Sequence, residues 1–401
     1  MQGGGLSVSR LDQMRKVMAR HVELGTIPGL VTLVSRRGQT QVEAIGLKEF
    51  DGSEPMGRDT IFRIASVTKP IVAIAAMILV EECVLRLDDP VDPLLPELAD
   101  RQVLRSIDSD IDDTVPANRP ITLRDLLTFQ LGLGAIFAEP GTYPIQQALD
   151  ELGLTPGPML PTVGPDEYLG RLGKLPLLYQ PGERWLYNIG SDILGVLIAR
   201  ATQMSLGDFL RERIFTPLGM VDTGFMVPED KLDRLAGSYW TNFATGEFGV
   251  FDGIDNSWYA QEPIFESGAG GLVSTADDLL AFGEMMLNGG HYGHVRVVSR
   301  PTVELMTMDQ LLPEEKNPAD FFPGFWEANG WGLGISVNTR KINLATSPGR
   351  YGWDGGYGTS WYVDPHEEMI GILLTQRVLD GQAVMNVYAD FWTSAYQAID
   401  D

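Results

Sequence analysis

Ser66 and Lys69 lie three residues apart, a spacing that suits a nucleophile and the base that activates it. They come just before the unbroken apolar run 71–80, which predicts a buried helix. Because Pro70 is tolerated only near the first turn of a helix, we expect this helix to begin close to Ser66. Residues three apart then share one helix face. A lysine buried within reach of a serine hydroxyl can lose its proton and act as a base, so the pair predicts nucleophilic catalysis.

A Ser-x-x-Lys pair by itself also fits a helix-capping serine beside a solvated lysine. Histidine offers no well-placed competing base. The chain has four histidines, on an expected helix face or in turns, where structural roles are expected: His21, His291, His294 and His366. Neither a Gly-x-Ser-x-Gly elbow nor a His-Glu-x-x-His motif occurs. If Ser66 is a nucleophile, we therefore expect its base to be a residue other than histidine.

The composition describes a globular protein of one large or two ordinary domains, with 401 residues, 44% of them hydrophobic and 21% charged. A formal charge of −24 opposes binding to nucleic acids and anionic membranes. No uncharged apolar run reaches the ~18 residues that a membrane helix needs. Cys83 is the only cysteine, so no intrachain disulfide or thiolate metal cluster can form, and we expect a buried, inert thiol there.

The N-terminal residues 1–7 have neither the cationic nor the apolar region of a secretory signal. For a chain that begins at its native start, we therefore expect a cytoplasmic location. The sequence leaves the oligomeric state open.

Both ends of the chain predict parts of one antiparallel sheet. An amphipathic helix at 8–24 precedes a hairpin formed by 30–34 and 41–45, and a second hairpin formed by 360–363 and 369–375 precedes a final helix. The middle of the chain differs, with capping-box-like helix starts at Thr122 and Ser205 and loops rich in proline and glycine such as 153–165. We therefore expect an α/β domain from residues 1–92 and 265–401, and an inserted, mainly helical domain from residues 93–264.

Tyr187 lies in a loop that leads into another apolar helix, at 193–198. A tyrosine in such a loop can be held over a site in the neighbouring domain. Beside Lys69 its phenol would ionise more easily, because a nearby cation favours the phenolate. The alternative interpretation is an ordinary packed loop tyrosine.

A glycine-rich segment at 352–359 immediately precedes the strand expected at 360–363. Glycines beside a strand allow a second backbone or a substrate to approach closely. A backbone N–H in this segment can pair with the N–H of Ser66 to hold an oxyanion. The alternative is a simple glycine-rich turn. The aromatic segment 321–331 is consistent either with an acyl pocket or with ordinary packing.

Five collinear stretches resemble the class C β-lactamase-like serine hydrolases, and the family VIII carboxylesterases among them in particular. The stretches are Phe-Arg-Ile-Ala-Ser-Val-Thr-Lys at 62–69, Ile-Thr-Leu-Arg-Asp-Leu-Leu-Thr at 121–128, Trp-Leu-Tyr at 185–187 with Asp-Ile-Leu-Gly at 192–195, Gly-Gly-Leu-Val-Ser-Thr at 270–275, and Tyr-Gly-Trp-Asp-Gly at 351–355 with Trp-Tyr-Val-Asp-Pro at 361–365. Their order and spacing agree over nearly the whole chain, which is far more specific than any one motif.

The resemblance implies a penicillin-recognising, β-lactamase/transpeptidase-like fold, in which an antiparallel sheet is flanked by helices and the active site lies between the sheet domain and the helical domain. It makes Ser66 the nucleophile, Lys69 the partner that shares its proton, and Tyr187 the general base. It places the oxyanion hole at the amides of Ser66 and Gly356. It implies no metal or cofactor.

The sequence departs from the pattern of β-lactamases and transpeptidases at two places. Their third motif is usually Lys-Thr-Gly, and its cation helps to hold the β-lactam carboxylate. Here Trp353, Asp354 and Gly355 occupy those positions, and we expect them to line the substrate pocket with Asn188. An unpaired Asp354 there would repel that carboxylate. If Asp354 points into the sheet instead, this repulsion is absent, but the missing cation still weakens binding of the carboxylate. The second motif usually carries an asparagine two residues after the tyrosine, whereas here Asn188 follows Tyr187 directly, which leaves its ability to substitute open.

These observations favour a serine carboxylesterase that acts on a small-molecule ester or amide through an acyl-serine. The alternatives within the same fold are a β-lactamase or D-amino-acid peptidase, and an acyltransferase on a small-molecule alcohol. A catalytically silent binding protein is a further alternative, although a pure binder has no need of Ser66, Lys69 and Tyr187 together.

Overall fold

The computed structural model describes residues 4–242, 245–317 and 321–401. Its central element is a seven-stranded sheet with the order β11-β12-β13-β14-β15-β1-β2, in which every neighbouring pair is antiparallel. The strands come from both ends of the chain: β1 (Gly29–Arg36), β2 (Gln39–Gly46), β11 (Asn329–Trp331), β12 (Ser336–Asn338), β13 (Tyr351–Gly355), β14 (Thr359–Asp364) and β15 (Met369–Thr375). Both predicted hairpins and their shared sheet are therefore confirmed.

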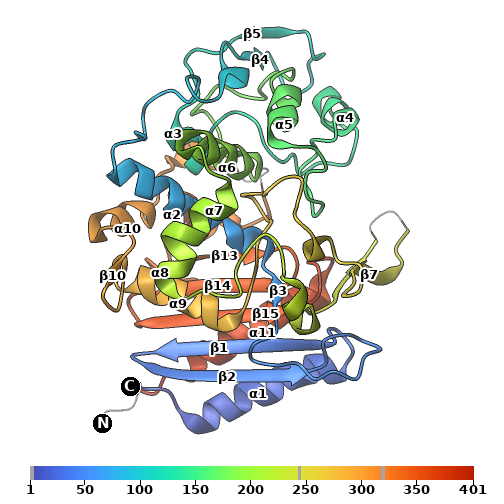
Figure 1. Cartoon of the computed structure of the whole chain (residues 1–401), viewed down its shortest axis with the longest axis vertical. Coiled ribbons are helices and arrows are strands. Elements are labelled where there is room, and N and C mark those ends of the chain that lie inside the picture. The colour runs from blue at the N-terminus through green and yellow to red at the C-terminus, as the bar shows by residue number, and fades with distance from the viewer. Residues whose placement is uncertain (1–3, 243–244, 318–320) are drawn as a thin grey trace.

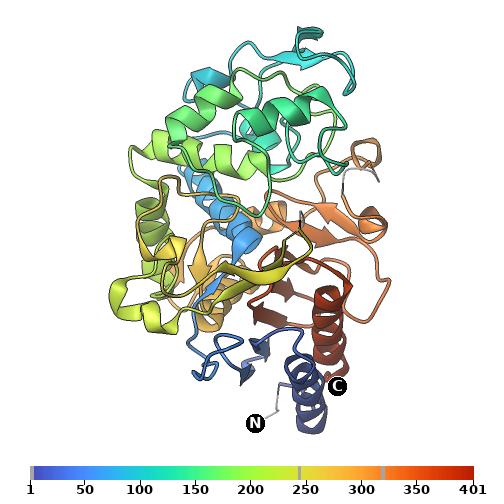
Figure 2. The ribbon, with the colours of Figure 1, turned by 90° about the vertical axis from the view of Figure 1, so that its right-hand side faces the viewer.

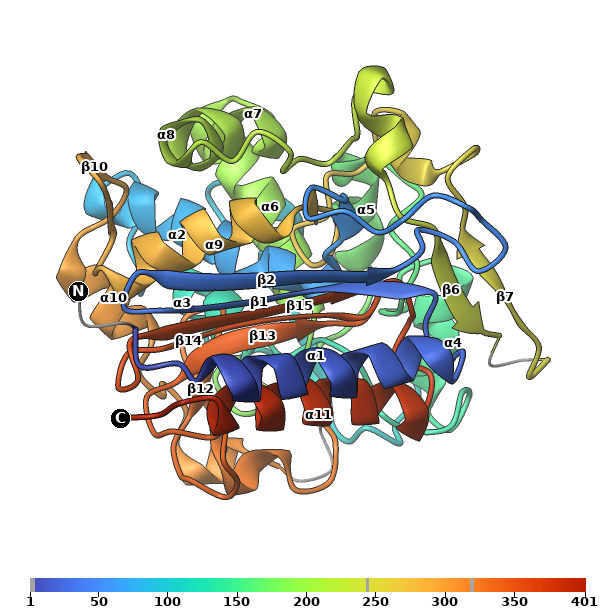
Figure 3. The same ribbon diagram turned by 90° about the horizontal axis from the view of Figure 1, so that it is seen from below.

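The two ends of the chain meet where β1 pairs with β15, from Leu30 opposite Thr375 to Arg36 opposite Met369. Helices α1 (Val8–Glu23) and α11 (Gln382–Gln397) pack side by side on one face of the sheet, and α9 (Ala276–Leu287) packs on the other (Figure 3). Every residue of β1 is buried, because helices cover both faces of this strand. The predicted terminal helices thus form one layer of the sheet domain.

Helix α2 (Thr68–Glu81) begins within two residues of the position predicted for it, after a 3-10 turn at Ala65–Val67. It is buried along its length from Thr68 to Leu79, as expected for a helix that is apolar on all sides. The apolar run ends before Cys83, whose side chain is exposed, so the prediction of a buried thiol was wrong. The chain turns there with a φ of 58° at Cys83, which carries this residue out of the core.

Helices are the main regular elements of the middle of the chain. Much of this part lies beyond the edge of the sheet that is farther from β2, and the rest, including the hairpin at 238–252, lies beside the sheet (Figures 1 and 2). Its helix starts follow the predicted caps. Thr122 caps α3 by accepting a bond from the Asp125 amide, while the Asp125 carboxylate accepts one from the Thr122 amide; Ser205 caps α7. The elements of this part are β4 (Gln102–Leu104), β5 (Thr114–Pro116), α3 (Leu123–Leu127), α4 (Pro144–Glu151), α5 (Pro165–Leu172), α6 (Ile189–Thr202), α7 (Leu206–Leu210), α8 (Thr216–Leu218), β6 (Ser238–Thr241) and β7 (Phe248–Asp252).

The remaining short elements lie outside this part. They are β3 (Phe62–Arg63), which pairs with β8 (Val273–Ser274), the hairpin of β9 (His291–Tyr292) and β10 (Val295–Arg296), and α10 (Arg300–Met306). The division at residues 92/93 and 264/265 stays a prediction. Residues 1–3, which belong to the N-terminal segment 1–7, lie outside the described residues.

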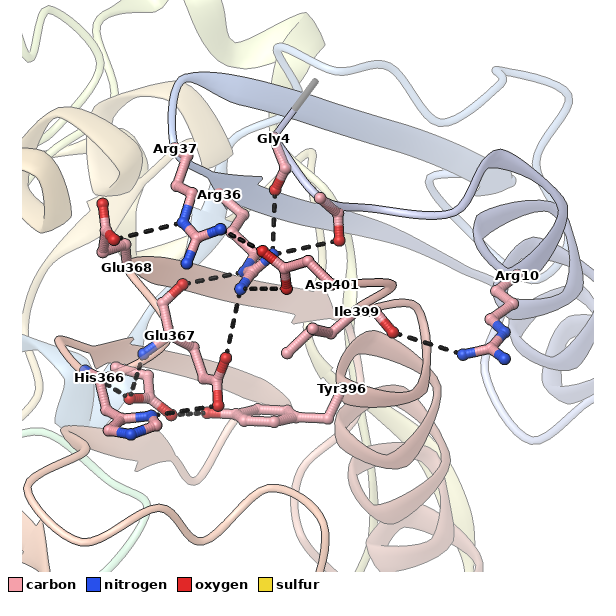
Figure 4. A network of polar contacts seen from close by, with 12 residues as sticks. Gly4, Arg10, Arg36, Arg37, His366, Glu367, Glu368, Tyr396, Ile399 and Asp401 are labelled. Atoms are coloured by element: carbon pink, nitrogen blue, oxygen red, sulfur yellow. Dashed lines mark hydrogen bonds and ion pairs between the residues drawn. The ribbon is translucent and has the colours of Figure 1, made fainter. Parts of the chain in front are cut away.

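Arg36 joins the two termini to the sheet (Figure 4). Its buried guanidinium donates hydrogen bonds to the carbonyl oxygens of Gly4 (3.2 Å) and Gly5 (3.1 Å), and to that of Glu367 (2.9 Å). It also forms an ion pair of 2.9 Å with Asp401. A single buried cation therefore satisfies acceptors from the start, the last hairpin and the end of the described chain.

No single helix in the described ranges has the length and apolar character needed to cross a membrane. The helices Ile189–Thr202 and Leu206–Leu218 have the required length and hydropathy only when they are counted as one segment, and the segment is bent by 79° between them.

Candidate active site

Ser66 lies in the tight turn between β3 and α2. Ala65 adopts a φ of 46°, a conformation that side chains other than glycine rarely take and that is often found at functional sites. The third motif passes directly against this turn: a Cβ at Gly355 would lie 2.3 Å from the carbonyl oxygen of Ile64, and Thr359 Oγ1 donates to that oxygen at 2.9 Å. Glycine at position 355 is therefore what lets the strand approach the turn that holds Ser66 so closely.

Lys69 extends from the first turn of α2 toward Ser66, with 2.9 Å between Nζ and Ser66 Oγ. Nζ also donates to Asn188 Oδ1 at 2.8 Å and to the carbonyl oxygen of Ala269 at 2.6 Å. The side chain is buried, and this burial lowers the pKa of Lys69 to about 7, although the Asp192 carboxylate acts in the opposite direction. Burial therefore favours the neutral amine, which is the form of lysine that can accept a proton.

Asp192 is a buried acid in the first turn of α6. Its Oδ1 accepts hydrogen bonds from Ser267 Oγ (2.6 Å) and from the Ala269 amide (3.0 Å), and the carbonyl of the same Ala269 accepts from Lys69. Burial raises the pKa of Asp192, while these hydrogen bonds and Lys69 oppose the rise. The sequence interpretation missed this connection. Its one signal was a carboxylate within the apolar stretch 189–198, because a buried acid requires partners.

Asn188 immediately precedes α6 and has a φ of 88°. A positive φ in a non-glycine residue is strained unless the surroundings hold it. Here the side chain is held by its hydrogen bond to Lys69. Asn188 therefore reaches the lysine although it stands one residue after Tyr187, where the related proteins usually have their asparagine two residues after the tyrosine.

Tyr187 lies with its ring centroid 4.5 Å from Lys69 Nζ and accepts a hydrogen bond of 2.7 Å from Trp353 Nε1. Its ring packs among aromatic side chains, with centroid separations of 5.6 Å to Phe129 and 5.3 Å to Phe321. Burial raises the pKa of Tyr187, against the effect of hydrogen bonds with Ser66 and Trp353. The prediction of an easily ionised phenol was therefore wrong: the lysine that was to supply the cation is itself buried, and desolvation dominates.

Trp353 and Asp354 point to opposite sides of β13, as neighbouring strand residues do. Trp353 faces Tyr187, whereas the Asp354 carboxylate accepts hydrogen bonds from Ser360 and from Tyr362 (3.2 Å). Burial raises the pKa of Asp354. Of the two expected orientations, Asp354 therefore adopts the one that points into the sheet, and it is not an unpaired acid in the substrate pocket.

A cavity of about 740 Å³ opens beside Ser66. Its lining includes Ala65, Asn188, Gly356 and Tyr357, and residues 153–162 form one side. Trp353, Asp354 and Gly355 do not belong to this lining, in contrast to the prediction for them. The space where a Cβ of Gly356 would lie is open, with no heavy atom within 4 Å. Ser66 and Gly356, the expected oxyanion pair, therefore border the same open space.

A second cavity of about 670 Å³ lies between α6, α7 and the loop at 221–228, away from Ser66, Lys69 and Tyr187. Across the described ranges, no group of three or more His, Cys, Asp or Glu side chains is arranged to hold a metal ion. The Ser66 site combines a hydroxyl, an amine with a pKa near neutrality, a phenol and backbone amides around an open cavity. Such an arrangement can carry out acyl transfer.

The chain is similar to known proteins over most of its length. The β-lactamase family model matches residues 14–390. An uncharacterized protein of Mycobacterium tuberculosis is 38% identical over 376 residues, which cover 92% of this chain and 91% of that protein. Esterase EstB of Burkholderia gladioli is 32% identical over 377 residues, 88% of this chain and 87% of EstB. The solved structure of EstCE1, described as a hydrolase with promiscuous acyltransferase activity, covers 98% of this chain and 99% of EstCE1, with a TM-score of 0.78 at 26% identity. These similarities confirm the fold predicted from the sequence.

Proposed function

Because the chain belongs to the β-lactamase family, we propose that it is a serine carboxylesterase that cleaves esters through an acyl-serine intermediate. Membership in this family of hydrolases and its mixed α/β fold set the general class of reaction. Similarity to esterase EstB supports ester hydrolysis as the specific reaction. We propose Ser66 as nucleophile, with Lys69 and Tyr187 as the groups that move its proton.

The observation that carries the proposal is the set of partners around Lys69 Nζ. Two of them, Asn188 Oδ1 and the Ala269 carbonyl, can only accept hydrogen bonds. A neutral amine has two N–H donors, and these two acceptors use both. Its lone pair is then directed at the third partner, the Ser66 hydroxyl at 2.9 Å, which can donate. With a pKa of about 7, this neutral form is available at physiological pH.

In the proposed reaction, Ser66 Oγ bonds to the ester carbonyl carbon while its proton passes to Lys69. The carbonyl oxygen becomes an oxyanion near the amides of Ser66 and Gly356. The carbon–oxygen bond to the alcohol then breaks, and the leaving alcohol takes a proton from the Tyr187 hydroxyl. Lys69 then passes its proton to the Tyr187 oxygen. A raised pKa keeps Tyr187 protonated until the alkoxide, which is a stronger base than a phenolate, takes its proton. Water then attacks the acyl carbon and gives a proton to the same pair. The bond between the acyl carbon and Ser66 Oγ breaks, the proton passes to Ser66 Oγ, and the carboxylic acid leaves.

Two other activities use the same residues. An acyltransferase differs only in the acceptor, an alcohol in place of water, and the description of EstCE1 supports this as a second activity. A β-lactamase or D-amino-acid peptidase is less well supported, because Trp353 stands where a lysine usually binds the substrate carboxylate. A silent binding protein would not need a buried lysine with a lowered pKa beside the serine.

Intact mass measurement after incubation with a fluorophosphonate and with short-chain p-nitrophenyl esters tests the proposal. We expect one covalent adduct on Ser66 in the wild type, none in Ser66→Ala, and loss of p-nitrophenol release by several orders of magnitude in that variant. Substantial turnover by a folded Ser66→Ala would rule out Ser66 as the nucleophile. A wild-type kcat/KM higher for nitrocefin than for every ester tested would favour the β-lactamase.

A further inference from the structure

One side of the Ser66 cavity is a segment without regular secondary structure, residues 154–162, called here the proline-rich wall. Its prolines, Pro156, Pro158 and Pro161, restrict the backbone and limit the conformations that the wall can adopt. Both ends are packed: Leu154 is buried in the main core, and Leu160 packs against the cluster that contains Ile61 and Tyr259. The middle of the wall faces the cavity.

A single hydrogen bond connects the middle of the wall to the opposite side of the cavity. Tyr357, the residue after Gly356, donates its hydroxyl proton to the carbonyl oxygen of Pro158. In the part of the chain that the structure describes, no other hydrogen bond holds the backbone of residues 155–163. The Tyr357 ring is itself buried and packs against Phe251 at a centroid separation of 5.2 Å. The wall is therefore held at a set distance from the proposed oxyanion amide.

The cavity is suited to an uncharged group. Of the described residues that line it, only Asp150 and Asp192 carry a charge when ionised, and Asp192 is already paired with Ser267 and Ala269. The rest of the lining is apolar or neutral, with leucine, proline, methionine and glycine along the wall. A substrate carboxylate would find no cation among these side chains and would be repelled by Asp150.

The volume of the cavity exceeds what a short acyl group needs. Pockets of about 300–1,000 Å³ bind ligands of drug size, and this one has about 740 Å³. An acetyl group would leave most of it filled with water, whereas a larger apolar group would displace that water. Each buried methylene contributes through the hydrophobic effect, so substrate size should affect binding strongly.

We propose that this cavity binds a bulky, uncharged, mainly apolar group attached to the scissile ester, and that Tyr357 is the positioning residue that holds the proline-rich wall against it. The inference rests on the proposed function, because it assumes that the bond cleaved is an ester next to Ser66. The group can be the acyl chain or the alcohol, and the experiment distinguishes these two sources.

Three pairs of substrates test the size and charge of the bound group. The acyl pair is p-nitrophenyl acetate and hexanoate, the alcohol pair is phenyl acetate and 2-naphthyl acetate, and the charge pair is p-nitrophenyl hexanoate and mono-p-nitrophenyl adipate, which has the same chain length and a terminal carboxylate. We expect kcat/KM to favour the larger member of the acyl or the alcohol pair by about tenfold or more. We also expect it to favour hexanoate over adipate by about tenfold or more. Equal rates within both size pairs, or within the charge pair, would overturn the proposal.

Tyr357→Phe keeps the ring and removes the hydrogen bond to Pro158. In the pair for which the wild type prefers the larger ester, we expect this variant to reduce the ratio of kcat/KM for the larger ester to that for the smaller one severalfold. The main cause should be a higher KM for the larger ester. The matched control is Tyr259→Phe, a nearby buried tyrosine whose hydroxyl has no hydrogen-bond partner among the described residues. It should keep the wild-type ratio. An unchanged ratio in Tyr357→Phe, or an equal fall in both variants, would contradict the positioning role.

The fluorophosphonate experiment separates this inference from the proposed function. If Ser66 is labelled and acetate esters are hydrolysed but no size or charge preference exists, the inference fails alone. If Ser66 is not labelled, the proposed function fails, and the inference fails with it.

Discussion

The indole N–H of Trp353 donates a hydrogen bond to the phenol oxygen of Tyr187 across 2.7 Å. The family pattern would place a lysine at position 353. An uncharged donor therefore orients the phenol without adding a cation to the site. This hydrogen bond can stabilise the Tyr187 oxygen when that oxygen gains negative charge. The indole supplies no positive charge that could bind a substrate carboxylate.

Trp353→Phe should lower kcat for p-nitrophenyl butyrate by about tenfold to a hundredfold with little change in KM, because a hydrogen bond to a group that gains charge is worth about 1.5–3 kcal/mol. The phenylalanine keeps most of the aromatic packing around Tyr187. Trp326→Phe is the matched control, since Trp326 belongs to the same aromatic cluster and its Nε1 donates to the Asn317 carbonyl instead. A similar fall in kcat in both variants would show that packing, not the hydrogen bond, matters.

Trp353→Lys should raise the ratio of kcat/KM for nitrocefin to that for p-nitrophenyl esters, because it places a cation beside Tyr187. Asp354→Lys, which sequence reasoning alone would have chosen, should instead lower the melting temperature without raising that ratio, because position 354 faces Ser360 and Tyr362 inside the sheet domain. Steady-state rates and thermal unfolding of both variants check this. A higher nitrocefin ratio in Asp354→Lys but not in Trp353→Lys would mean that residue 354, and not residue 353, faces Tyr187.

The acylation rate should rise with pH through about 7, where Lys69 loses its proton. The Asp192 carboxylate favours the ammonium form of Lys69. Asp192→Asn should therefore lower the pKa of Lys69 further and move the acidic limb of the kcat/KM profile to lower pH. A limb that moves to higher pH would contradict the proposed electrostatic link.

Lys69→Met should be inactive but more stable than the wild type near neutral pH. The pKa of Lys69 falls from 10.5 to about 7 on folding, so between these values the unfolded chain binds more protons than the folded one. The contribution of Lys69 to the free energy of unfolding is therefore most unfavourable below pH 7, and it improves as the pH rises to 10.5. Denaturant melts at several pH values should show the advantage of Lys69→Met shrinking over this window. An advantage that grows with pH would contradict the lowered pKa.

Arg36→Ala should cost about 1–3 kcal/mol of stability, because it leaves the carbonyl oxygens of Gly4, Gly5 and Glu367, which are buried or partly buried, without their donor. The matched control is Arg37→Ala, a neighbour whose side chain is 40% exposed and whose ion pairs lie at the surface. Its cost should be much smaller than that of Arg36→Ala, because ion pairs at the surface contribute little to stability. Equal losses in urea melts of the two variants would mean that the network in Figure 4 contributes little.

Several features followed directly from local sequence. The spacing of Ser66 and Lys69 placed both on one turn of a helix, and the structure has them 2.9 Å apart. Two pairs of strand-like segments, each joined by a short turn, predicted the hairpins β1–β2 and β14–β15. The capping pattern at Thr122 predicted the start of α3. These predictions hold because helix pitch, strand alternation and capping depend on a few neighbouring residues.

Other features depended on residues that are far apart in the chain. The position of Asp354 on β13 defines its side of the strand, but only the packing of the sheet decided that this side faces Ser360 and Tyr362. The direction of the Tyr187 pKa shift followed from burial, which no local pattern reports. The contact of Asp192 with Ala269, and through it with Lys69, joins three separate segments. Local sequence determined which groups the site could use, and tertiary packing decided their partners and protonation, because desolvation and long-range contacts arise only when the whole chain folds.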